Sequence, residues 1–316
     1  RPKYLPEKFE ILQNEGGGLP EFWRKSNLLK KATIIPFFIT QSLAVIRYSK
    51  DCQIIHANWT LSGAAAWITK WIHHLPFIVT VQGSDIFQAP KNRLFRIVTN
   101  KSLNSANKVI ALSKSLMNDT INLGVPQQKI LVIPNGVDIS TFHRGEINRE
   151  PVILFVGSLI KRKGPEFLLD AFNLVQKVKP EYRIIFIGDG SLRQYLEKKS
   201  EELSINDKVQ FLGFQPPEIV AKKLRSAMVF VLPSLEEGLG VVLLEALASG
   251  TPIVSSSVGG IVDVVNQDTG ILVPPADSKS LANAILEIIE NESNWKARSN
   301  HCRELAESKF DWNVIA

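Results

Sequence analysis

Two glutamates stand eight positions apart in the stretch EGLGVVLLEALASG, which covers residues 237–250. Two carboxylates at one pocket could serve as the acid and base of a glycoside hydrolase if they lie about 5–10 Å apart. Glu237 and Glu245 could equally hold a ligand from two sides, or be two ordinary charges near the start of a helix. The spacing alone leaves all three interpretations open.

The glycines of this stretch separate the two carboxylates. Gly238 and Gly240 are expected to keep Glu237 on a loop with exposed backbone N–H groups, because glycine favours such loops. The apolar run from Val241 then begins a helix that carries Glu245 in its second turn. A carboxylate inside an apolar run is costly to bury without hydrogen-bond donors, which sugar hydroxyls would supply. We therefore favour a diphosphate at the glycine loop with one glutamate on each side.

The stretch KRKG, residues 161–164, places three cations just before a segment that is expected to be helical. Free N–H groups and the helix dipole make a helix N-terminus a good site for an anion, and lysines add to the attraction. An exposed basic turn would explain the same residues equally well.

Short apolar runs rich in β-branched residues alternate with helical patterns along the whole chain. Continuous apolar runs are typical of parallel strands buried on both faces, and the alternation predicts two doubly wound α/β domains. The boundary is expected in the turn-rich segment 134–151, giving domains at residues 1–143 and 144–316. The predicted strands are 53–57, 77–81, 108–112, 130–133, 152–156, 183–187, 209–212, 229–232, 252–255 and 270–273, and the clearest predicted helices are 165–178, 192–203 and 278–290.

Several strands of the second half end in glycine-rich or polar turns. In open α/β sheets ligands bind outside the carboxyl ends of the strands, so these turns are expected to rim one pocket. The turns are Gly157-Ser158, Gly188-Asp189-Gly190, Gly213-Phe214 and Pro233-Ser234.

The net charge of +6 is divided unevenly along the chain. Residues 1–150 carry 19 Lys and Arg against 10 Asp and Glu, whereas residues 151–316 carry 18 against 21. The basic half is either a solvated face or the contact for an anionic partner, such as a membrane surface or a phosphorylated acceptor. The sequence contains no nucleic-acid-binding motif, so nucleic acid is not expected as a partner.

The uncharged stretches and the cysteines of the sequence bear on its cellular location. The longest uncharged stretch, residues 32–46, is too short and too polar to cross a bilayer. Cys52 and Cys302 fit neither a metal nor a disulfide spacing, and unpaired thiols suggest a reducing compartment. We expect a cytoplasmic protein, with peripheral contact at the inner face of the membrane as an alternative, and no metal site.

Several segments resemble the signature segments of the family-4 retaining glycosyltransferases, also called glycosyl transferases group 1, which have the GT-B fold. They are SLEEGLGVVLLEALASGTPIVSSSVGG, GSLIKRKG and VIALSKSLMNDTINLGVPQQKILVIPNGVD. The resemblance covers nearly the whole chain and is strongest in the second half. It implies two Rossmann-like α/β domains that face each other across a cleft. The first would bind the acceptor and the second a nucleotide-diphosphate sugar, without a metal or a cofactor.

The resemblance also assigns roles within the donor site. It implies that Glu237 lies beside the donor sugar and takes part in catalysis, that Glu245 binds the ribose, and that Lys163 neutralises the departing diphosphate. The rest of the implied donor site is Ser158, Arg162, Phe214, Gln215, Gly238, Leu239 and Gly240.

The first half supplies the implied acceptor site, with two departures from the family. The usual HAHW reads HANW here, and the usual HGSD reads QGSD. The resemblance places His56, Asn58 and Asp85 at the acceptor and Gln82 beside the donor sugar as a catalytic residue. A glutamine cannot act as a general base at neutral pH. The front-face displacement proposed for such retaining enzymes does not require one.

Two further departures bear on activity. Ser158 stands where the family usually has an arginine, so Lys161 or Arg162 would have to supply that charge. The chain begins past the strand and glycine-rich loop that open such proteins and stops before their closing helix. We therefore expect both ends to be missing from this sequence.

The sequence thus predicts a metal-independent hexosyltransferase of polysaccharide biosynthesis. It would move a hexose from a nucleotide-diphosphate sugar to a hydroxyl of a glycan or lipid-linked acceptor. One alternative is a glycoside hydrolase that uses Glu237 and Glu245. The other is a non-catalytic sugar-nucleotide-binding fragment, which Gln82, Ser158 and the missing ends suggest.

Overall fold

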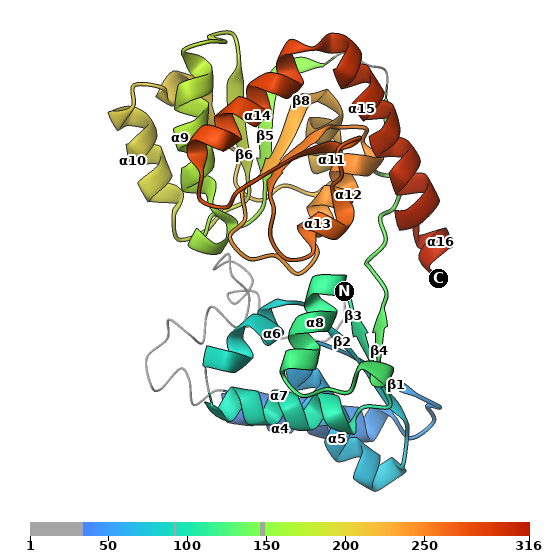
Figure 1. Cartoon of the computed structure of the whole chain (residues 1–316). Coiled ribbons are helices and arrows are strands. Elements are labelled where there is room, and N and C mark those ends of the chain that lie inside the picture. The colour runs from blue at the N-terminus through green and yellow to red at the C-terminus, as the bar shows by residue number, and fades with distance from the viewer. Residues whose placement is uncertain (1–33, 92, 146–148) are drawn as a thin grey trace. The chain divides into compact units, whose positions relative to one another are not determined.

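The structure, a computed structural model, describes residues 34–91, 93–145 and 149–316. These residues form two compact units, of which the first ends at Pro134 and the second begins at Asn135 (Figure 1). Each unit is built of helices around a parallel sheet, as the sequence predicts. All ten predicted strands are present, and their ends differ from the predicted ones by at most two residues.

The segment that follows Pro134 is bonded to the second unit. Val137 forms a bridge with Asp311, and its N–H donates to the carbonyl of Phe310 at 2.7 Å. The guanidinium of Arg303 donates to the carbonyl of Phe142 at 2.9 Å. These bonds explain why the division between the units falls earlier in the chain than the predicted boundary at residue 143.

The first unit contains a four-stranded parallel sheet. Its elements are α4 (Ile34–Tyr48), β1 (Ile55–Asn58), α5 (Thr60–His73), β2 (Phe77–Val81), α6 (Ser84–Gln88), α7 (Arg93–Ser105), β3 (Lys108–Ala111), α8 (Lys114–Asn122) and β4 (Ile130–Val132). The strands follow the order β1-β2-β3-β4. Helix α5 lies against β1 and β2, and small residues allow a close approach. A Cβ on Gly63 of α5 would lie 2.4 Å from Oγ of Ser102 on α7 and 2.8 Å from Cγ2 of Val79 on β2.

The second unit contains a six-stranded parallel sheet. Its elements are β5 (Glu150–Val156), α9 (Pro165–Gln176), β6 (Arg183–Ile187), α10 (Arg193–Glu202), β7 (Val209–Phe211), α11 (Pro217–Ser226), β8 (Ala227–Leu232), α12 (Val241–Ala248), β9 (Ile253–Ser256), α13 (Ile261–Val264), β10 (Gly270–Val273), α14 (Ser278–Glu290), α15 (Glu292–Leu305) and α16 (Trp312–Ile315). The strand order is β10-β9-β8-β5-β6-β7. Helices α9 and α14 pack against each other, and α12 packs against α15.

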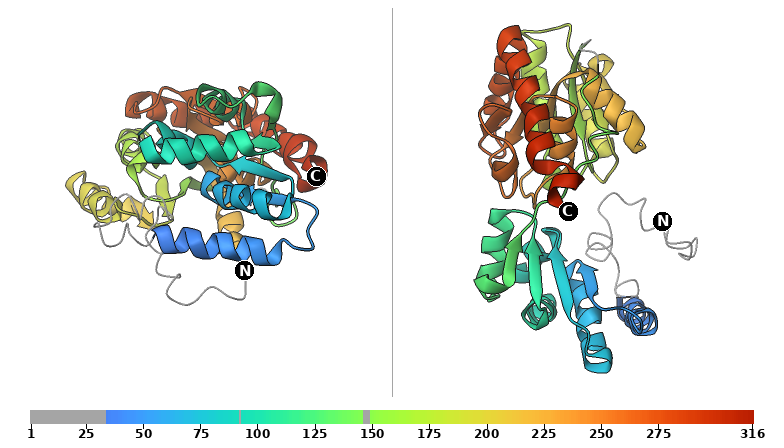
Figure 2. Two further views of the ribbon diagram at one scale, coloured as in Figure 1. Left: turned by 90° about the horizontal axis from the view of Figure 1, so that it is seen from below. Right: turned by 90° about the vertical axis from the view of Figure 1, so that its right-hand side faces the viewer.

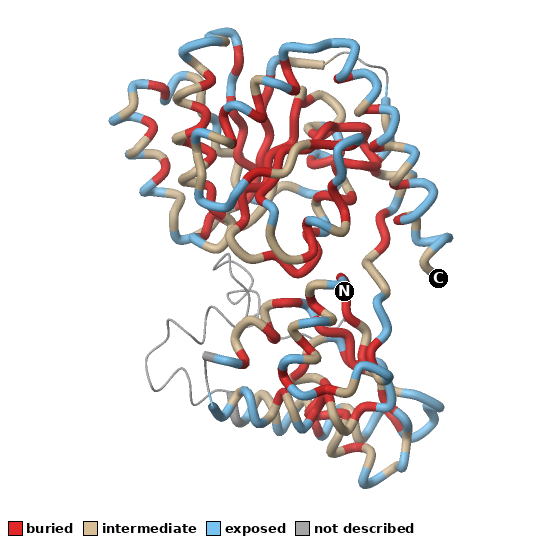
Figure 3. Tube along the Cα trace, viewed as in Figure 1, coloured by how far each residue is buried: buried red, intermediate tan, exposed pale blue. Residues whose placement is uncertain are grey.

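The core of the second unit lies on its central strands, which are buried on both faces (Figure 3). Three phenylalanines cross neighbouring strands: the ring of Phe186 lies 5.5 Å from that of Phe155 and 5.1 Å from that of Phe211, centroid to centroid. This arrangement accounts for the continuous apolar runs in the sequence, because neither face of such a strand contacts water.

The guanidinium of Arg149 is mostly buried at the end of the sheet where β5 begins. Arg149 donates to the carbonyls of Leu224, Ala227, Ser249 and Gly250 and to the hydroxyl of Thr251, at 2.8–3.1 Å. Burial lowers the pKa of Arg149 to about 10. Its partners include the carbonyls at the end of α12, so one cation satisfies groups that a helix C-terminus leaves unpaired.

None of the described helices is both long enough and apolar enough to cross a membrane.

Candidate active site

The strand order of the second unit reverses between β5 and β8. The chain places β6 and β7 on one side of β5, and β8, β9 and β10 on the other. At such a switch point the turns after the two central strands diverge and leave a crevice at their carboxyl ends, where ligands bind in sheets of this type. The turn after β5 contains Ser158 and KRKG, and the turn after β8 contains Ser234 and EGLG. Both predicted motifs therefore stand at the switch point.

The KRKG turn lies directly against the turn after β8. Lys161–Lys163 form a single 3₁₀ turn that ends at Gly164, whose φ is +63°. A Cβ on Gly164 would lie 2.2 Å from the carbonyl oxygen of Pro233, so only glycine fits there. The N–H of Leu235 donates to the carbonyl of Arg162 at 2.8 Å.

This contact brings Lys163 and Glu237 together. The ammonium of Lys163 donates to Oε2 of Glu237, and the hydroxyl of Ser234 donates to the same oxygen at 3.3 Å. The side chains of Lys163 and Glu237 are only 15% and 9% exposed. An ion pair screened from water to this degree interacts more strongly than a surface pair. Lys163 is therefore not part of an exposed basic turn.

The glycine loop holds the backbone of Glu237 in place. A Cβ on Gly259, in the turn after β9, would lie 2.0 Å from the carbonyl oxygen of Glu237, and that oxygen accepts from the N–H of Gly260 at 3.0 Å. Gly240 has a φ of +82° and directly precedes α12, as the sequence predicts. The side chain of Leu239 is buried, so this residue can offer a ligand only backbone groups.

Glu245 lies in the second turn of α12, a mostly buried helix that begins after the loop of Glu237. Burial raises the pKa of its carboxyl to about 7. Among the described residues the carboxylate has no hydrogen-bond partner. A half-buried carboxylate without donors is unstable in its charged form, and a ligand that brought hydroxyl donors would relieve this cost.

The remaining predicted donor residues occupy the same edge of the sheet at different distances from the switch point. Ser158 follows β5, and its carbonyl accepts from the N–H of Ile160 at 2.9 Å. Phe214 and Gln215 follow β7, two strands away, with Phe214 56% exposed. The amide of Gln215 donates to the carbonyl of Leu212 at 2.7 Å, within its own turn.

Of the residues predicted to bind substrates in the first unit, His56 lies within β1, Asn58 ends it, and Gln82 directly follows β2. His56 and Asn58 are exposed, and the ring of His56 is hydrogen-bonded to the hydroxyl of Thr80 on β2 at 2.7 Å. Gln82 is exposed at the end of β2. These three side chains are thus exposed, and their roles stay predictions.

Asp85 differs from the other three because it is completely buried. Its carboxylate accepts from the backbone N–H groups of Thr60, Gln82 and Ile86, at 3.1–3.2 Å. Burial raises its pKa to about 6, against the effect of these bonds. Asp85 therefore fixes the turn that carries Gln82 and ties it to the start of α5, and its part in acceptor binding stays a prediction.

The sequence did not predict the contacts that three residues make with Glu237. Ser234 donates to Glu237, and Gly259 and Gly260 hold the carbonyl of Glu237. Ser234 ends one of the turns expected to rim the pocket, and the two glycines lie within the quoted signature segment. All three residues thus lie in segments that the sequence analysis singled out. Their contacts with Glu237 could not be predicted, because they depend on how the turns after β5, β8 and β9 pack together. Among the described residues no group of three or more His, Cys, Asp or Glu side chains could hold a metal ion.

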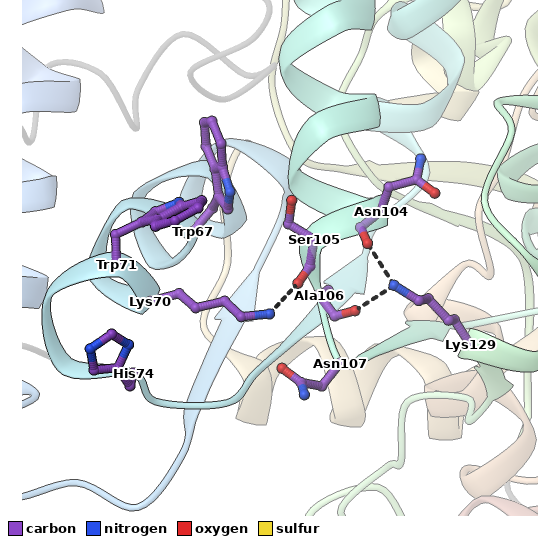
Figure 4. A pocket seen from close by; sticks show the side chains of 9 residues that line it. All are labelled: Trp67, Lys70, Trp71, His74, Asn104, Ser105, Ala106, Asn107 and Lys129. Carbon is purple, nitrogen blue, oxygen red and sulfur yellow. Dashed lines mark hydrogen bonds between the residues drawn. The ribbon is translucent and has the colours of Figure 1, made fainter.

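A cavity of about 570 Å³ lies elsewhere, in the first unit (Figure 4). Its walls come from the end of α5, the end of α7 and the starts of β3 and β4. It therefore adjoins the amino ends of β3 and β4, opposite the edge that carries Gln82.

Comparison with known proteins assigns the family. The profile described as "Glycosyl transferases group 1" matches residues 138–309, more than half of the chain, and the profile described as "Glycosyltransferase Family 4" matches residues 9–141. The chain belongs to this family of glycosyltransferases. Its two matched regions cover both units, and the predicted membership is confirmed.

Two curated relatives illustrate the similarity. This glycosyltransferase is 30% identical over 288 residues to the uncharacterized glycosyltransferase MJ1607 of Methanocaldococcus jannaschii, with 84% of this chain and 73% of the relative covered. It is 27% identical over 275 residues to the putative teichuronic acid biosynthesis glycosyltransferase TuaC of Bacillus subtilis, with 82% and 67% covered.

Solved structures confirm the fold. Sucrose-phosphate synthase from Thermosynechococcus elongatus matches with a TM-score of 0.78 at 26% identity, over 99% of this chain and 77% of that one. Anabaena HepE in complex with UDP and glucose matches with a TM-score of 0.78 at 23% identity, over 87% and 78%. The predicted GT-B fold is therefore confirmed, and glycosyl transfer, not glycoside hydrolysis, is the activity of the family.

Proposed function

We propose that this glycosyltransferase moves a hexose, with retention of its anomeric configuration, from a nucleotide-diphosphate sugar to a hydroxyl of a glycan or lipid-linked acceptor. The observation that carries the proposal is the screened contact of Lys163 with Glu237 beside the glycine loop at the switch point. It puts a cation, a carboxylate and the N-terminus of α12 at the crevice where a ligand of this fold binds.

Each group has a distinct part in this proposal. The ammonium of Lys163 and the N–H groups of the loop at Gly238–Gly240 stabilise the negative charge that develops on the leaving diphosphate. Electrostatic stabilisation of developing charge is usually the largest single contribution to catalysis. Glu237 orients the sugar, and Glu245 accepts hydrogen bonds from the ribose hydroxyls. No residue is required as a general base, which accords with Gln82 in the first unit.

The donor site is tested by a thermal-shift panel of UDP-, GDP-, ADP- and dTDP-hexoses. A donor present at about 100 times its Kd stabilises the protein by about 2.7 kcal/mol, so the stabilising compound identifies both base and sugar. Lys163→Met should abolish the shift, whereas Lys177→Met, which removes an exposed lysine at the far end of α9, should preserve it. Glu237→Gln keeps the shape of the pair and serves as a second variant if Lys163→Met unfolds.

Turnover distinguishes the proposed transferase from its alternatives. We expect transfer with retention, measured by NMR of the anomeric proton, and a loss of about 100-fold or more in Lys163→Met. Donor binding without transfer to any acceptor would favour the non-catalytic binder. Hydrolysis of a simple glycoside without nucleotide would contradict the proposal.

A further inference from the structure

The cavity of the first unit is lined by one side of α5 and by the end of α7. Four of its lining residues follow the helical spacing i, i+3, i+4 and i+7, which places them on one side of α5: Trp67, Lys70, Trp71 and, directly after the last residue of the helix, His74. Helices α5 and α7 pack against each other, and seen from below they lie side by side (Figure 2, left). The cavity thus lies where both helices end.

Two ammonium groups stand in this cavity without a carboxylate. Nζ of Lys70 donates to the carbonyl of Ser105 at 3.1 Å. Nζ of Lys129 donates to the carbonyls of Asn104 and Ala106, at 2.6 and 3.2 Å. Both lysines therefore lie at the negative pole of α7, which is equivalent to only about half an elementary charge. Because neither lysine is paired with Asp or Glu among the described residues, the cavity is positively charged and attracts an anion.

The cavity offers a ligand mostly hydrogen-bond donors. An ammonium has three N–H donors, so Lys70 keeps two and Lys129 keeps one beyond the bonds to α7. The side-chain oxygen of Asn107 accepts from the N–H of Phe77 at 3.2 Å, whereas the two amide N–H groups of Asn107 have no partner among the described residues. The carbonyls at the end of α7 already accept from the two lysines. A matching ligand therefore brings acceptors, and the hydroxyl donors of an uncharged sugar find few partners here.

Two indole rings give the cavity flat apolar surfaces, next to the lysines that point toward the end of α7 (Figure 4). Trp71 is 73% exposed, whereas Trp67 has the ammonium of Lys101 over its ring, 5.9 Å from the centroid. Aromatic side chains stack with flat heteroaromatic rings of any identity. A cavity of about 570 Å³ also has the size of a site for a whole small molecule, not for a single ion.

We propose that this cavity binds a small anion with a flat heteroaromatic ring, the chemistry of a nucleoside monophosphate. The ring stacks on the exposed indole of Trp71, its carbonyl groups accept from the amide of Asn107, and the phosphate accepts from Lys70 and Lys129. All of these residues belong to the first unit, whereas the residues of the proposed donor site belong to the second. The proposal therefore does not rest on the proposed function.

NMR of the indole N–H groups of the full chain tests the proposal at the site itself. The signals of Trp67 and Trp71 are assigned from Trp67→Phe and Trp71→Phe, and UMP and AMP are the probes. We expect at least one of the two nucleotides to shift both signals. Uridine and adenosine, which lack the phosphate, should bind about 10-fold or more weakly, because hydrogen bonds to charged groups are the stronger ones. Ribose 5-phosphate, which lacks the base, should bind about 5-fold to 100-fold more weakly.

Three outcomes of this titration would overturn the proposal. The first is that neither nucleotide shifts the two signals. The second is that a nucleoside binds as tightly as its nucleotide, since the anion would then contribute nothing. The third is that ribose 5-phosphate or glycerol 3-phosphate binds as tightly as the nucleotides. Glycerol 3-phosphate is the headgroup fragment of a phospholipid, so this result would indicate a phosphate site without preference for a ring.

Two variants with matched controls test the residues, with the signal of Trp67 as the readout and circular dichroism as the check of folding. Trp71→Ala should weaken nucleotide binding about 5-fold or more, whereas Tyr48→Ala, at an aromatic side chain that is 77% exposed on α4, should not. Lys70→Gln keeps an N–H for the carbonyl of Ser105 and should weaken binding about 10-fold, whereas Lys50→Gln, at an exposed position, should not.

Unchanged affinity in either cavity variant, or an equal loss in its control, would contradict the assignment. Lys163→Met separates this site from the proposed donor site. It should leave the shifts of Trp67 and Trp71 intact, and loss of these shifts in folded Lys163→Met would overturn the proposal of a separate site.

Discussion

Replacement of Glu245 by glutamine should stabilise the ligand-free protein while weakening donor binding. The carboxyl has a pKa raised to about 7 from its ordinary 4.5, because α12 and its neighbours shield it from water. A raised carboxyl pKa means that stability from this group is fully present below pH 4.5 and is lost as the pH rises through 7. Glutamine has no charged form and escapes this loss.

The magnitude follows from the shift. At about 1.4 kcal/mol per pKa unit, the ionised carboxylate costs the folded state about 3 kcal/mol at pH 8, and less than about 1 kcal/mol at pH 5. Water that reaches the half-buried side chain reduces the difference between the two pH values to about 2 kcal/mol. For a folding unit of the size of the second unit, the melting temperature of Glu245→Gln should therefore exceed that of the wild type by about 4–8 °C more at pH 8 than at pH 5.

Differential scanning calorimetry at pH 5 and pH 8 measures this effect, and isothermal titration with the donor identified by the thermal-shift panel measures affinity. Donor affinity of the wild type should rise with pH up to about 7 and then level off, since the ionised form accepts the ribose hydroxyls. The variant should show weaker and pH-independent binding. Glu201→Gln, at an exposed position on α10, is the control and should change neither quantity. If Glu245→Gln melted at or below the wild-type temperature at pH 8, the carboxylate would not be the desolvated group inferred here.

Three further predictions concern a glycine and an arginine of the second unit and the two thiols of the chain. Gly164→Ala should destabilise the protein by about 2–4 kcal/mol in urea denaturation, because the new Cβ would overlap the carbonyl oxygen of Pro233. Gly124→Ala is the control: Gly124 also has a positive φ, but the nearest atom to its Cβ would be 3.8 Å away, so this change should cost only about 1 kcal/mol. Arg149→Met should cost about 3–5 kcal/mol in the same assay, since five buried acceptors each lose one hydrogen bond, and a loss below about 1 kcal/mol would contradict that role. Iodoacetamide at pH 8 should label Cys52, which is exposed, and spare Cys302, whose pKa burial raises well above its ordinary range; mass spectrometry of the folded protein showing both thiols labelled would refute this.

The sequence predicts the strands well because their composition reflects burial on both faces, which is a local property. The strands at 183–187 and 270–273 match the structure residue for residue for this reason. The positions of glycines also predict local backbone geometry. Gly240, for example, has a positive φ at the point where the loop ends and α12 begins. The resemblance to the family then supplied the predicted donor residues Lys163 and Glu237, which the structure brings into contact.

What could not be predicted depends on contacts between distant segments. The burial of Asp85 arises because its carboxylate reaches the N–H of Thr60, 25 residues earlier in the chain. The place of Ser234 beside Glu237 depends on the meeting of the turns after β5 and β8. Neither hydrophobic periodicity nor residue spacing predicts contacts between distant turns, because the sequence of each turn is compatible with many arrangements.

The two arginines at the far end of α12 have a consequence for its near end. Arg149 binds the carbonyls of Ser249 and Gly250, and Arg303 binds that of Ala248 at 2.8 Å, so positive charge lies against the negative pole of this helix. At the opposite pole, the first turn of α12 contains no acidic residue, and the nearby carboxylate of Glu237 is paired with Lys163. Helix α12 is thus a fixed dipole whose C-terminal end is anchored by two arginines. An anion that arrives at the glycine loop meets a field that is already oriented, and its binding requires no rotation of the helix.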